Sequence, residues 1–230
     1  MAIQDLRQNY TPEPIDPEDL LGNPFDQFLA WFEDAKDVGI LEPNAFTLAT
    51  ADADGTPNAR TLLLKGVDDP PRESPETPEP HAMTSGGRGL VFYTNYNSSK
   101  GDELAANPRA CMNFYWDTLA RCVRIPGTVT KVSAEETAAY FKTRPRESQL
   151  GAWTSHQSSV IDGREDLMLK FFQLTEEYPD ETPIPVPPTW GGYRVVPNSF
   201  EFWQGQPSRL HDRLRYTPDG DSWKIDRLSP

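Results

Sequence analysis

The segment from Glu201 to Arg213 concentrates the side chains of this chain that are best suited to chemistry. It reads Glu-Phe-Trp-Gln-Gly-Gln-Pro-Ser-Arg-Leu-His-Asp-Arg, and so it combines aromatic rings, an imidazole and guanidinium groups in one short stretch. If the part from Arg209 onward is extended, Arg209, His211 and Arg213 lie on one face, because side chains alternate along a strand. Two cations around an imidazole suit an anionic ligand with an aromatic body. Taken alone, the pattern is also typical of a surface strand whose arginines are solvated.

Two strand-like segments carry further cations. Arg60 and Lys65 stand at the two ends of an apolar run and face opposite sides of a strand, so they could serve two different anionic groups. Tyr93 and Thr94 end another strand-like run, and Lys100 follows near a predicted helix start, where unpaired backbone N–H groups attract anions. In isolation, the first segment is equally compatible with a strand that has polar ends, and the second with a simple helix cap.

A predicted helix carries the next group of polar side chains. Tyr140, Arg144 and Ser148 recur every four residues, which places them on one face of a helix whose path Pro145 must bend. A phenol, a guanidinium and a hydroxyl on one face suit a phosphate group, although an exposed helix end gives the same pattern. The pair Gln157-Ser158 adds an amide and a hydroxyl in a predicted loop.

The charge balance of the whole chain makes these clusters informative together. The 230 residues carry a formal net charge of −13, with 35 acidic and 22 basic side chains. Such a field repels polyanions, so we expect neither nucleic acid nor an anionic membrane surface as a partner. Several anion-binding patterns in so acidic a chain indicate that basic side chains converge locally. Two phosphate groups account for their number better than one.

Length and composition predict a cytoplasmic protein with a single domain over residues 23–230. Residues 1–22 are polar and contain prolines, which predicts a flexible N-terminal arm that lacks the basic and apolar regions of a signal peptide. The sequence contains no run of 18 apolar residues, so we expect no membrane span. Cys111 and Cys122 lie in apolar strand-like runs, so we expect buried, reduced thiols and no metal site.

Local signals define the elements that must position these side chains. Asn23-Pro24 is an N-cap followed by proline at the first helical position, and the helix that it begins is expected to end at Gly39. Ser133 and Glu136 form a capping box that begins a second helix. Further helices are expected over residues 98–106 and 164–178. Strands are expected over residues 45–51, 60–67, 90–95, 110–116, 121–132, 193–197, 199–204, 212–216 and 223–228.

Residues 68–89 interrupt this pattern of elements. Prolines are interleaved with acidic residues there, and Gly86-Gly87 follows. Such a composition cannot form a packed element, so the segment is predicted to be a disordered or loosely held insertion.

The number and order of the expected strands predict the fold class. Many strands with few helices between them favour a mainly β fold with flanking helices, an α+β barrel, over a doubly wound sheet. The sequence contains no Gly-x-Gly-x-x-Gly motif and no phosphate-binding loop that ends in Gly-Lys-Ser or Gly-Lys-Thr. Any nucleotide must therefore be held by side chains and barrel edges.

Several short motifs follow one another along the chain in a recognisable order. They are Arg60–Lys65, Phe92–Asn95, Tyr140–Arg146, Gly151–Trp153, Trp190–Gly192, Glu201–Arg213 and Arg227–Pro230. In this order the chain closely resembles the pyridoxamine 5′-phosphate oxidase family, from about residue 20 to the C-terminus, with residues 68–89 as an interruption. The most specific part is Phe-Trp-Gln-Gly followed by Arg-Leu-His-Asp-Arg.

The resemblance implies a fold, a cofactor and a reaction. The fold is an FMN-binding split β-barrel that forms a homodimer, with flavin mononucleotide (FMN) at each of two sites between the subunits. The reaction is the oxidation of pyridoxine 5′-phosphate or pyridoxamine 5′-phosphate to pyridoxal 5′-phosphate, with O2 reduced to H2O2, as in vitamin B6 salvage. Hydride transfer from the substrate C4′ carbon to flavin N5 is the expected step, because the cofactor supplies the difficult chemistry.

The resemblance also implies a role for each matching residue. Arg209 and His211 would be catalytic and, with Leu210, would lie over the pyridine ring of the substrate. The residues expected to bind FMN are Arg60, Thr61, Leu62, Leu63, Leu64, Lys65, Tyr93, Thr94, Lys100, Gln157, Ser158, Trp203 and Arg213. The residues expected to bind the substrate are Lys65, Tyr140, Arg144, Ser148, Arg209, Leu210 and His211.

Two positions depart from the pattern of the family. Ser99 stands where the family usually has an arginine before the lysine of the helix start, and Cys122 stands where it usually has a glutamine that contacts the flavin ring. Each lost contact is worth roughly 1–3 kcal/mol as a charge-assisted or buried hydrogen bond. We therefore expect weaker FMN binding than is typical of the family.

Two other functions are compatible with the sequence. A related flavin oxidase, such as those of phenazine biosynthesis, would act on a different substrate, although the cluster around Arg144 suits a phosphate. A non-catalytic flavin- or pyridoxal-phosphate-binding protein would explain the departures at Ser99 and Cys122, although the presence of Arg209 and His211 argues against it.

Overall fold

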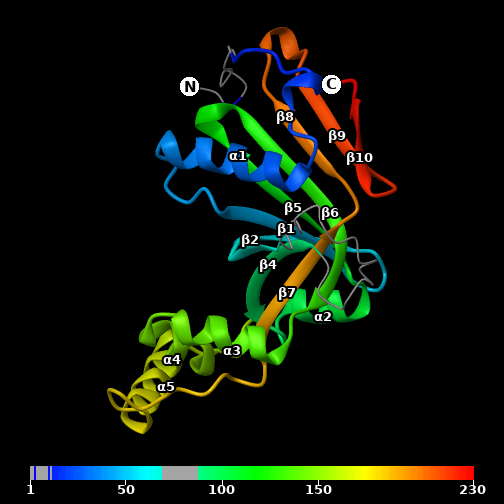
Figure 1. The fold of residues 1–230 in the computed structure, drawn as a ribbon. Helices are drawn as coiled ribbons and strands as arrows, with labels where there is room; N and C mark the ends of the chain where they lie inside the picture. The colour runs from blue at the N-terminus through cyan, green and yellow to red at the C-terminus, as the bar shows by residue number, and fades with distance from the viewer. Residues whose placement is uncertain (1–2, 4–9, 11, 69–87) are drawn as a thin grey trace, which may run out of the picture.

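The computed structural model describes residues 3, 10, 12–68 and 88–230, and within them ten strands form one antiparallel sheet with five α-helices around it (Figure 1). The strands are β1 (Ala45–Ala51), β2 (Pro57–Leu63), β3 (Gly66–Asp68), β4 (Gly89–Asn95), β5 (Arg109–Trp116), β6 (Arg121–Lys131), β7 (Trp190–Pro197), β8 (Phe200–Gln204), β9 (Asp212–Asp219) and β10 (Ser222–Arg227). The helices are α1 (Pro24–Asp37), α2 (Ser99–Ala106), α3 (Ala134–Thr143), α4 (Arg146–Thr154) and α5 (Arg164–Glu177). The expected class, mainly β with flanking helices, is confirmed.

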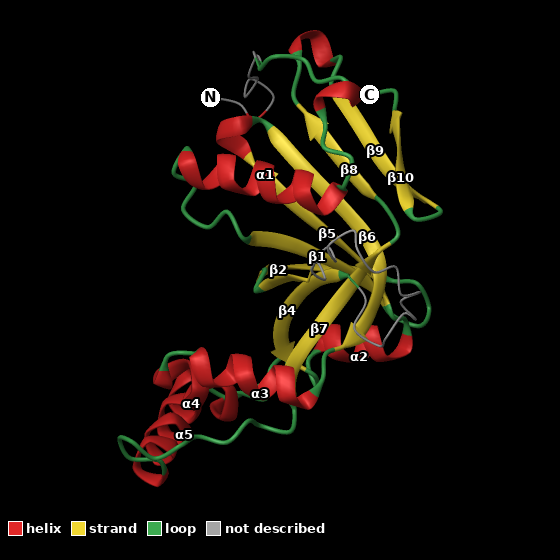
Figure 2. Ribbon diagram, in the orientation of Figure 1, coloured by secondary structure: helices red, strands yellow, loops and turns green. Residues whose placement is uncertain are grey.

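Strand β6 is the element at which the sheet divides. One side of β6 pairs with β5, whereas the other side pairs with β8 over Arg121–Arg124 and with β7 over Gly127–Lys131. Pro126 lies between these two stretches, and a proline has no N–H to offer to a strand ladder. The sheet therefore runs β10-β9-β8-β6-β5-β1-β2 on one path and leaves β6 through β7 and β4 to β3 on the other. The result is a curled, split barrel (Figure 2).

Helix α1 covers one half of this sheet and closes the main hydrophobic core. Its start follows the predicted signals, because the Asn23 side chain accepts a hydrogen bond from the Phe25 N–H at 2.9 Å and Pro24 occupies the first turn. Phe28 and Trp31 are buried on its inner face, at the spacing of an amphipathic helix. Their rings meet those of β5 and β8 at centroid distances of about 5 Å, in edge-to-face contacts.

Helices α3, α4 and α5 form a lobe that projects from the ends of β4 and β7 (Figure 1). The capping box that begins α3 is confirmed on its first half, since the Ser133 hydroxyl accepts from the Glu136 N–H at 3.1 Å. The lobe has a hydrophobic cluster of its own, which consists of Phe141, Leu150, Leu174, Ile184 and Trp190. Trp190 begins β7, so this small core is tied directly to the barrel.

The expected single strand over residues 60–67 is wrong in its bounds. Strand β2 begins three residues earlier and ends at Leu63, and Gly66–Asp68 forms the separate strand β3. The chain changes its partner between them, because the Leu64 N–H donates to the Asn44 carbonyl and the Lys65 N–H donates to the Val91 carbonyl, both at 2.8 Å. Strand β2 pairs with β1 before this point and β3 pairs with β4 after it, so the segment forms two strands.

The two segments expected to be irregular lie partly outside the described residues. Of the predicted insertion at 68–89, residues 69–87 are outside them, and Asp68 pairs with Gly89 where β3 meets β4. Of the predicted arm at 1–22, residues 3, 10 and 12–22 are described, and residues 12–22 run along the barrel. The Arg227 guanidinium donates to the Ile15 carbonyl at 2.6 Å, and the Tyr216 hydroxyl donates to the Leu21 carbonyl at 2.6 Å.

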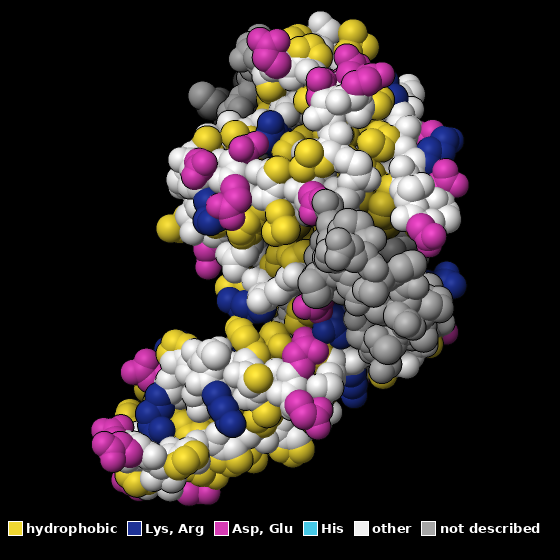
Figure 3. Space-filling view, viewed as in Figure 1, with side chains coloured by type: hydrophobic (Ala, Val, Ile, Leu, Met, Phe, Trp, Pro, Cys, Tyr) yellow, Lys and Arg dark blue, Asp and Glu magenta, His cyan; other side chains and the backbone are white. Residues whose placement is uncertain are grey.

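The outer surface carries mixed charges. On the face shown in Figure 3, Asp and Glu side chains are scattered among Lys and Arg. In the part of the chain that the structure describes, no helix combines the length and apolar character that crossing a bilayer requires. The same described residues hold no cluster of three His, Cys, Asp or Glu side chains that could bind a metal ion.

Candidate functional site

A buried lysine lies at the junction of β4 and α2. Lys100 is only 6% exposed, and within the described part of the chain its ammonium donates to two neutral oxygens, Ser98 Oγ at 3.1 Å and Gln157 Oε1 at 2.8 Å. Burial is the main reason that the pKa of Lys100 is lowered, with the nearby Arg60 charge as a further cause. A desolvated cation with uncharged acceptors is suited to receive an anion.

Polar groups from three elements converge on this lysine. Thr94, at the end of β4, donates to Gln157 Oε1 at 3.2 Å, and the first N–H of α2, that of Ser99, donates to Ser158 Oγ at 3.2 Å. The structure thus brings together Thr94, Lys100, Gln157 and Ser158, as predicted from distant parts of the sequence. A helix N-terminus among hydroxyl and ammonium groups favours a phosphate.

Gly101 allows α2 to begin at this position. A Cβ on Gly101 would lie 1.9 Å from the Tyr96 carbonyl oxygen, so any other residue would push the first turn of α2 away from the barrel. The close approach keeps Lys100 and the first N–H groups of α2 against the end of β4.

Arg60 lies beside the lysine and is held by an acidic residue that the sequence did not single out. Its guanidinium donates to Glu103 Oε2 at 2.8 Å and to the Thr50 hydroxyl. Glu103 is fixed in turn by the Asn58 amide at 2.9 Å and by Thr50. Arg60 therefore borders the Lys100 cluster, but one carboxylate already neutralises part of its charge.

A stack of aromatic rings leads from the barrel to the lobe. The rings of Tyr93 and Tyr140 are stacked at a centroid distance of 3.9 Å, and Trp190 continues the stack. The Arg144 guanidinium lies 4.6 Å from the Trp190 ring centroid, and its Nη1 is buried with no hydrogen-bond partner among the described residues. Burial is the main cause that raises the pKa of Tyr93 to about 12, so its phenol stays protonated at neutral pH.

The expected bend at Pro145 is a complete break in the helix. Helix α3 ends at Thr143, Arg144 has an extended backbone conformation, and α4 begins after Pro145. The proline prevents a continuous helix because it lacks an N–H and restricts the residue before it. Ser148 consequently lies in the first turn of α4, and the idea that it shares one continuous helix face with Tyr140 is wrong.

The second half of the candidate site is a cavity of about 410 Å³ on the face of β5, β6, β8 and β9. Strand register explains how it is built. Cys122 is paired with Trp203, and Trp203 is paired with Arg213, so three side chains from three strands stand in one row. Its lining residues are Asn113, Tyr115, Cys122, Arg124, Glu201, Trp203, His211, Arg213 and Pro230.

The charges in this cavity are arranged around one buried carboxylate. Glu201 is 7% exposed and accepts hydrogen bonds from Arg213 Nε at 2.8 Å and from the Arg124 guanidinium. Arg213 also donates to the Ser229 carbonyl at 2.8 Å, which fixes the C-terminal residues at the cavity rim. The carboxylate orients both arginines. Because it neutralises only one of their two charges, the three side chains together keep a net positive charge.

His211 is oriented by the backbone and by an aromatic residue of the N-terminal segment. Its Nδ1 accepts a hydrogen bond from the Gln206 N–H at 3.0 Å, so the neutral ring carries its proton on Nε2. The ring lies 4.7 Å from Trp203 between centroids, and Tyr10 makes edge contacts with both rings at about 6 Å. His211 therefore presents an N–H donor at the cavity.

Arg209 does not belong to an extended segment, which corrects the expectation that it shares a strand face with His211 and Arg213. Residues Pro207–Arg209 form a short 3-10 turn, Ser208 and Arg209 both have positive φ angles of 57° and 63°, and β9 begins only at Asp212. Arg209 and Leu210 are exposed and are not among the residues that line the cavity. Their predicted contact with substrate remains a prediction.

The end of β2 and the two residues that follow it differ in their exposure to solvent. Thr61 and Lys65 are exposed, Leu62 and Leu63 are half-buried, and Leu64 is part of the hydrophobic core. A flavin contact by the Leu64 side chain would require a change in the core, so its backbone is the part available for binding.

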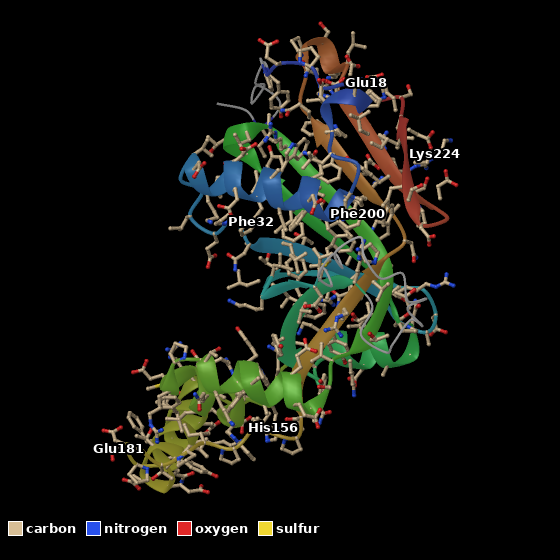
Figure 4. All side chains as sticks on the ribbon, viewed as in Figure 1. Glu18, Phe32, His156, Glu181, Phe200 and Lys224 are labelled. Atoms are coloured by element: carbon tan, nitrogen blue, oxygen red, sulfur yellow. The ribbon has the colours of Figure 1, made fainter. Side chains whose placement is uncertain are left out.

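The two groups of predicted residues lie at opposite ends of the folded molecule. His156, which directly precedes Gln157, lies in the helical lobe, whereas Phe200 at the start of β8 lies in the other half of the molecule (Figure 4). The Lys100 and Arg144 clusters therefore belong to one end, and the cavity around Trp203, His211 and Arg213 belongs to the other.

The residues present fit the FMN that the sequence resemblance implies. The FMN phosphate would be surrounded by the ammonium of Lys100, hydroxyl groups and a helix N-terminus. The cavity beside Trp203 has aromatic and positively charged walls that suit a planar ring. The buried Nη1 of Arg144 is a separate donor without a partner among the described residues, as a second phosphate requires.

The residues of these clusters that sequence reasoning missed include Tyr10, Glu103, Asn113, Arg124 and Glu201. The last three stand in a single row across β5, β6 and β8, because Asn113 is paired with Arg124 and Arg124 with Glu201. The alternation of side chains placed Glu201 on the face of Trp203, but the pairing of β6 with β8 is non-local and no motif revealed it.

Comparisons with known proteins agree along the whole chain. A family model described as pyridoxamine 5′-phosphate oxidase matches residues 32–176, and one described as the pyridoxine 5′-phosphate oxidase C-terminal dimerisation region matches residues 190–230. The pyridoxine/pyridoxamine 5′-phosphate oxidases of Bordetella petrii and Paraburkholderia phymatum are 50% and 51% identical to it. The alignments cover all of this chain and 100% and 99% of those proteins.

Solved structures share the fold. PhzG from Burkholderia lata, in complex with tetrahydrophenazine-1-carboxylic acid, superposes with a TM-score of 0.81 at 29% identity, over 95% of this chain and 98% of that one. A pyridoxamine 5′-phosphate oxidase-related, FMN-binding protein from Nostoc punctiforme gives a TM-score of 0.66 at 17% identity, over 90% and 98% of the two chains.

Proposed function

Because this chain belongs to the pyridoxamine 5′-phosphate oxidase family, we propose that it oxidises pyridoxine 5′-phosphate and pyridoxamine 5′-phosphate to pyridoxal 5′-phosphate, with FMN as cofactor and O2 as the electron acceptor. The observation that carries the proposal is the presence of two separate cationic centres, the buried Lys100 and the Nη1 of Arg144, which has no hydrogen-bond partner among the described residues. One suits the phosphate of FMN and the other the phosphate of the substrate.

The FMN phosphate is assigned to the junction of β4 and α2. Lys100 and Arg60 supply the positive charge there, and Thr94 and Ser158 supply hydroxyl groups. Gln157 now accepts from Lys100, so it is positioned to hold the ammonium in place when the phosphate binds. The other residues assigned to FMN are Thr61, Leu62, Leu63, Leu64, Lys65 and Tyr93 from the same end of the chain, and Trp203 and Arg213 from a second chain.

The substrate phosphate is assigned to Tyr140, Arg144 and Ser148, and Lys65 is also assigned to the substrate. The guanidinium can donate two parallel hydrogen bonds to a phosphate, and the Trp190 ring below it limits its orientations. The tyrosine stack brings Tyr140 against Tyr93, which joins the substrate end to the flavin end. This contact would hold both phosphates at a fixed separation.

When bound, the flavin would supply the oxidising chemistry, as the acceptor of two electrons from the substrate and their donor to O2, which would give H2O2. The chain itself positions the reacting groups. Arg209, Leu210 and His211 are assigned to the pyridine ring. The Nε2–H of His211 is fixed as a donor because Nδ1 accepts from Gln206, so it can hold an oxygen or nitrogen substituent of that ring.

The site is proposed to form between the two chains of a homodimer. The support is the distance between the two residue groups along the molecule and the match of residues 190–230 to a dimerisation region. These residues include β8 and β9, whose face carries the second half of the site. The two free thiols are also compatible with a cytoplasmic location, which we propose on this ground.

A phenazine-type substrate is the second candidate, because PhzG shares the fold at a TM-score of 0.81. A carboxylate-bearing phenazine without a phosphate makes less use of the buried Arg144 guanidinium, so the phosphorylated substrate is favoured. Peroxide release in air from FMN-loaded protein and pyridoxamine 5′-phosphate tests the proposal. Bleaching of the flavin absorption by the same substrate without O2 is the second expected result. If pyridoxamine 5′-phosphate gives neither signal, the protein is not this oxidase.

A further inference from the structure

Asn113 contributes a carboxamide to the cavity beside Trp203. It lies on β5, and its side chain lines the same wall as Cys122, Trp203 and Arg213. Asn113 is paired with Arg124 across the β5–β6 ladder, and Tyr115 is paired with Cys122, so Asn113 and Cys122 are diagonal neighbours on one face of the sheet.

The thiol of Cys122 orients this carboxamide. Its Sγ lies 3.0 Å from Asn113 Oδ1, in a geometry in which the thiol donates and the amide oxygen accepts. Burial, followed by the charge of Glu201, raises the pKa of Cys122 to about 11, so the thiol keeps its proton at neutral pH and remains a donor. Because Oδ1 is occupied by the thiol, the amide NH2 group of Asn113 is the part left for a ligand.

The charged side chains on this wall are committed to each other. Arg124 and Arg213 both donate to Glu201, and Arg213 also donates to the Ser229 carbonyl. Besides the Nε2–H of His211, the carboxamide of Asn113 is a neutral donor that this wall can offer to a ring carbonyl. An isoalloxazine ring carries carbonyl groups along its polar edge, and such a donor satisfies one of them.

We propose that Asn113 supplies to the flavin ring the amide contact for which the family usually uses a glutamine at the position of Cys122. The two positions exchange roles: the amide moves from β6 to β5, and the cysteine that replaces the glutamine turns the new amide toward the cavity. The inference rests on the proposed binding of FMN. It revises the expectation that the loss of glutamine at position 122 by itself weakens FMN binding.

Fluorescence titration of the flavin-free chain with FMN and with riboflavin tests this assignment, since flavin emission changes on binding. Asn113→Leu removes the amide at similar volume, and we expect it to weaken the binding of both flavins by about 5- to 30-fold. The double variant Asn113→Leu/Cys122→Gln restores the amide from β6, and we expect an affinity within about 3-fold of the unaltered chain. Cys111→Ala, on the same strand but outside the cavity lining, is the matched control.

Riboflavin separates this inference from the proposed function, because it has the ring but no phosphate. Lys100→Met should weaken only FMN, whereas Asn113→Leu should weaken both flavins equally. Thermal unfolding of the flavin-free variants checks their folding, and Asn113→Asp, which keeps the size and the thiol contact, replaces Asn113→Leu if that variant does not fold.

The assignment is overturned if the folded Asn113 variants bind riboflavin and FMN as tightly as the unaltered chain, or if Cys122→Gln fails to restore binding. If the unaltered chain itself binds no FMN, it is the proposed function that has failed.

Discussion

The clearest test of the phosphate site is the replacement Lys100→Met, which keeps the length of the side chain and removes its charge. A charge-assisted hydrogen bond contributes about 1.5–3 kcal/mol, so FMN should bind about 10- to 150-fold more weakly. The same replacement should raise the free energy of unfolding of the flavin-free protein or leave it unchanged. The reason is that Lys100 is 6% exposed and its partners Ser98 and Gln157 are neutral, so its burial is a cost in the absence of a phosphate.

Two measurements on the same sample separate these effects. Fluorescence titration gives the dissociation constant of FMN, and urea denaturation of the flavin-free protein gives its free energy of unfolding. Lys142→Met, at an exposed position on α3, is the matched control and should change neither quantity. A parallel loss of affinity and stability would show that Lys100 is structural, and an unchanged affinity would remove the phosphate from this position.

The pH dependence of the same site has a defined sign. The pKa of Lys100 is lowered from its ordinary value of 10.5, mainly by burial. Between the folded and the unfolded pKa, the unfolded chain binds more protons, so the contribution of Lys100 to stability becomes more favourable as the pH rises. FMN binding should weaken over the same alkaline range, because the ammonium loses its proton. FMN titrations from pH 7 to pH 10 check this, and the Lys100→Met variant should lack that decrease.

Three further changes test the rest of the site. Arg144→Met should lower kcat/KM for pyridoxamine 5′-phosphate by about tenfold or more, because the buried Nη1 of Arg144 is assigned to the substrate. The FMN dissociation constant should stay constant. Equal losses in kcat/KM and in FMN affinity would contradict that assignment. Arg209→Gly should raise the free energy of unfolding by up to about 1 kcal/mol, because glycine accepts its φ of 63°, and should lower the peroxide-release rate; an unchanged rate would exclude Arg209 from the site. With a pKa of about 11, about one Cys122 side chain in a thousand should be a thiolate at pH 8. Its alkylation by iodoacetamide, measured by mass spectrometry, should therefore accelerate roughly tenfold per pH unit up to pH 10. Fast alkylation at pH 8 would show an exposed thiol.

Elements with strong local signals could be predicted from the sequence. The Asn23 cap and Pro24 fixed the start of α1, and Ser133 fixed the start of α3, because these signals act over one helical turn. The convergence of Thr94, Lys100 and Gln157 also agrees with prediction, although only the resemblance to a family joined residues so far apart.

What could not be predicted depends on non-local pairing and on left-handed backbone. The division of β6 between β7 and β8 sets which side chains share the cavity, and neither Asn113 nor Arg124 belongs to a motif. The sequence allowed an extended segment from Arg209, because nothing in Ser208 and Arg209 indicates two consecutive positive φ angles. Likewise, the change of partner after Leu63 follows from where β4 lies and not from the apolar run itself.

The placement of the two residue groups at opposite ends of each chain has a consequence for mixtures of damaged chains. On the proposed pairing, a chain altered at Lys100 and a chain altered at Trp203 are each defective as homodimers. When the two are refolded together, one pocket of each hybrid carries both lesions and the other carries none. Random assortment would then rescue roughly a quarter of the normal turnover, a complementation that pockets built within single chains could never give.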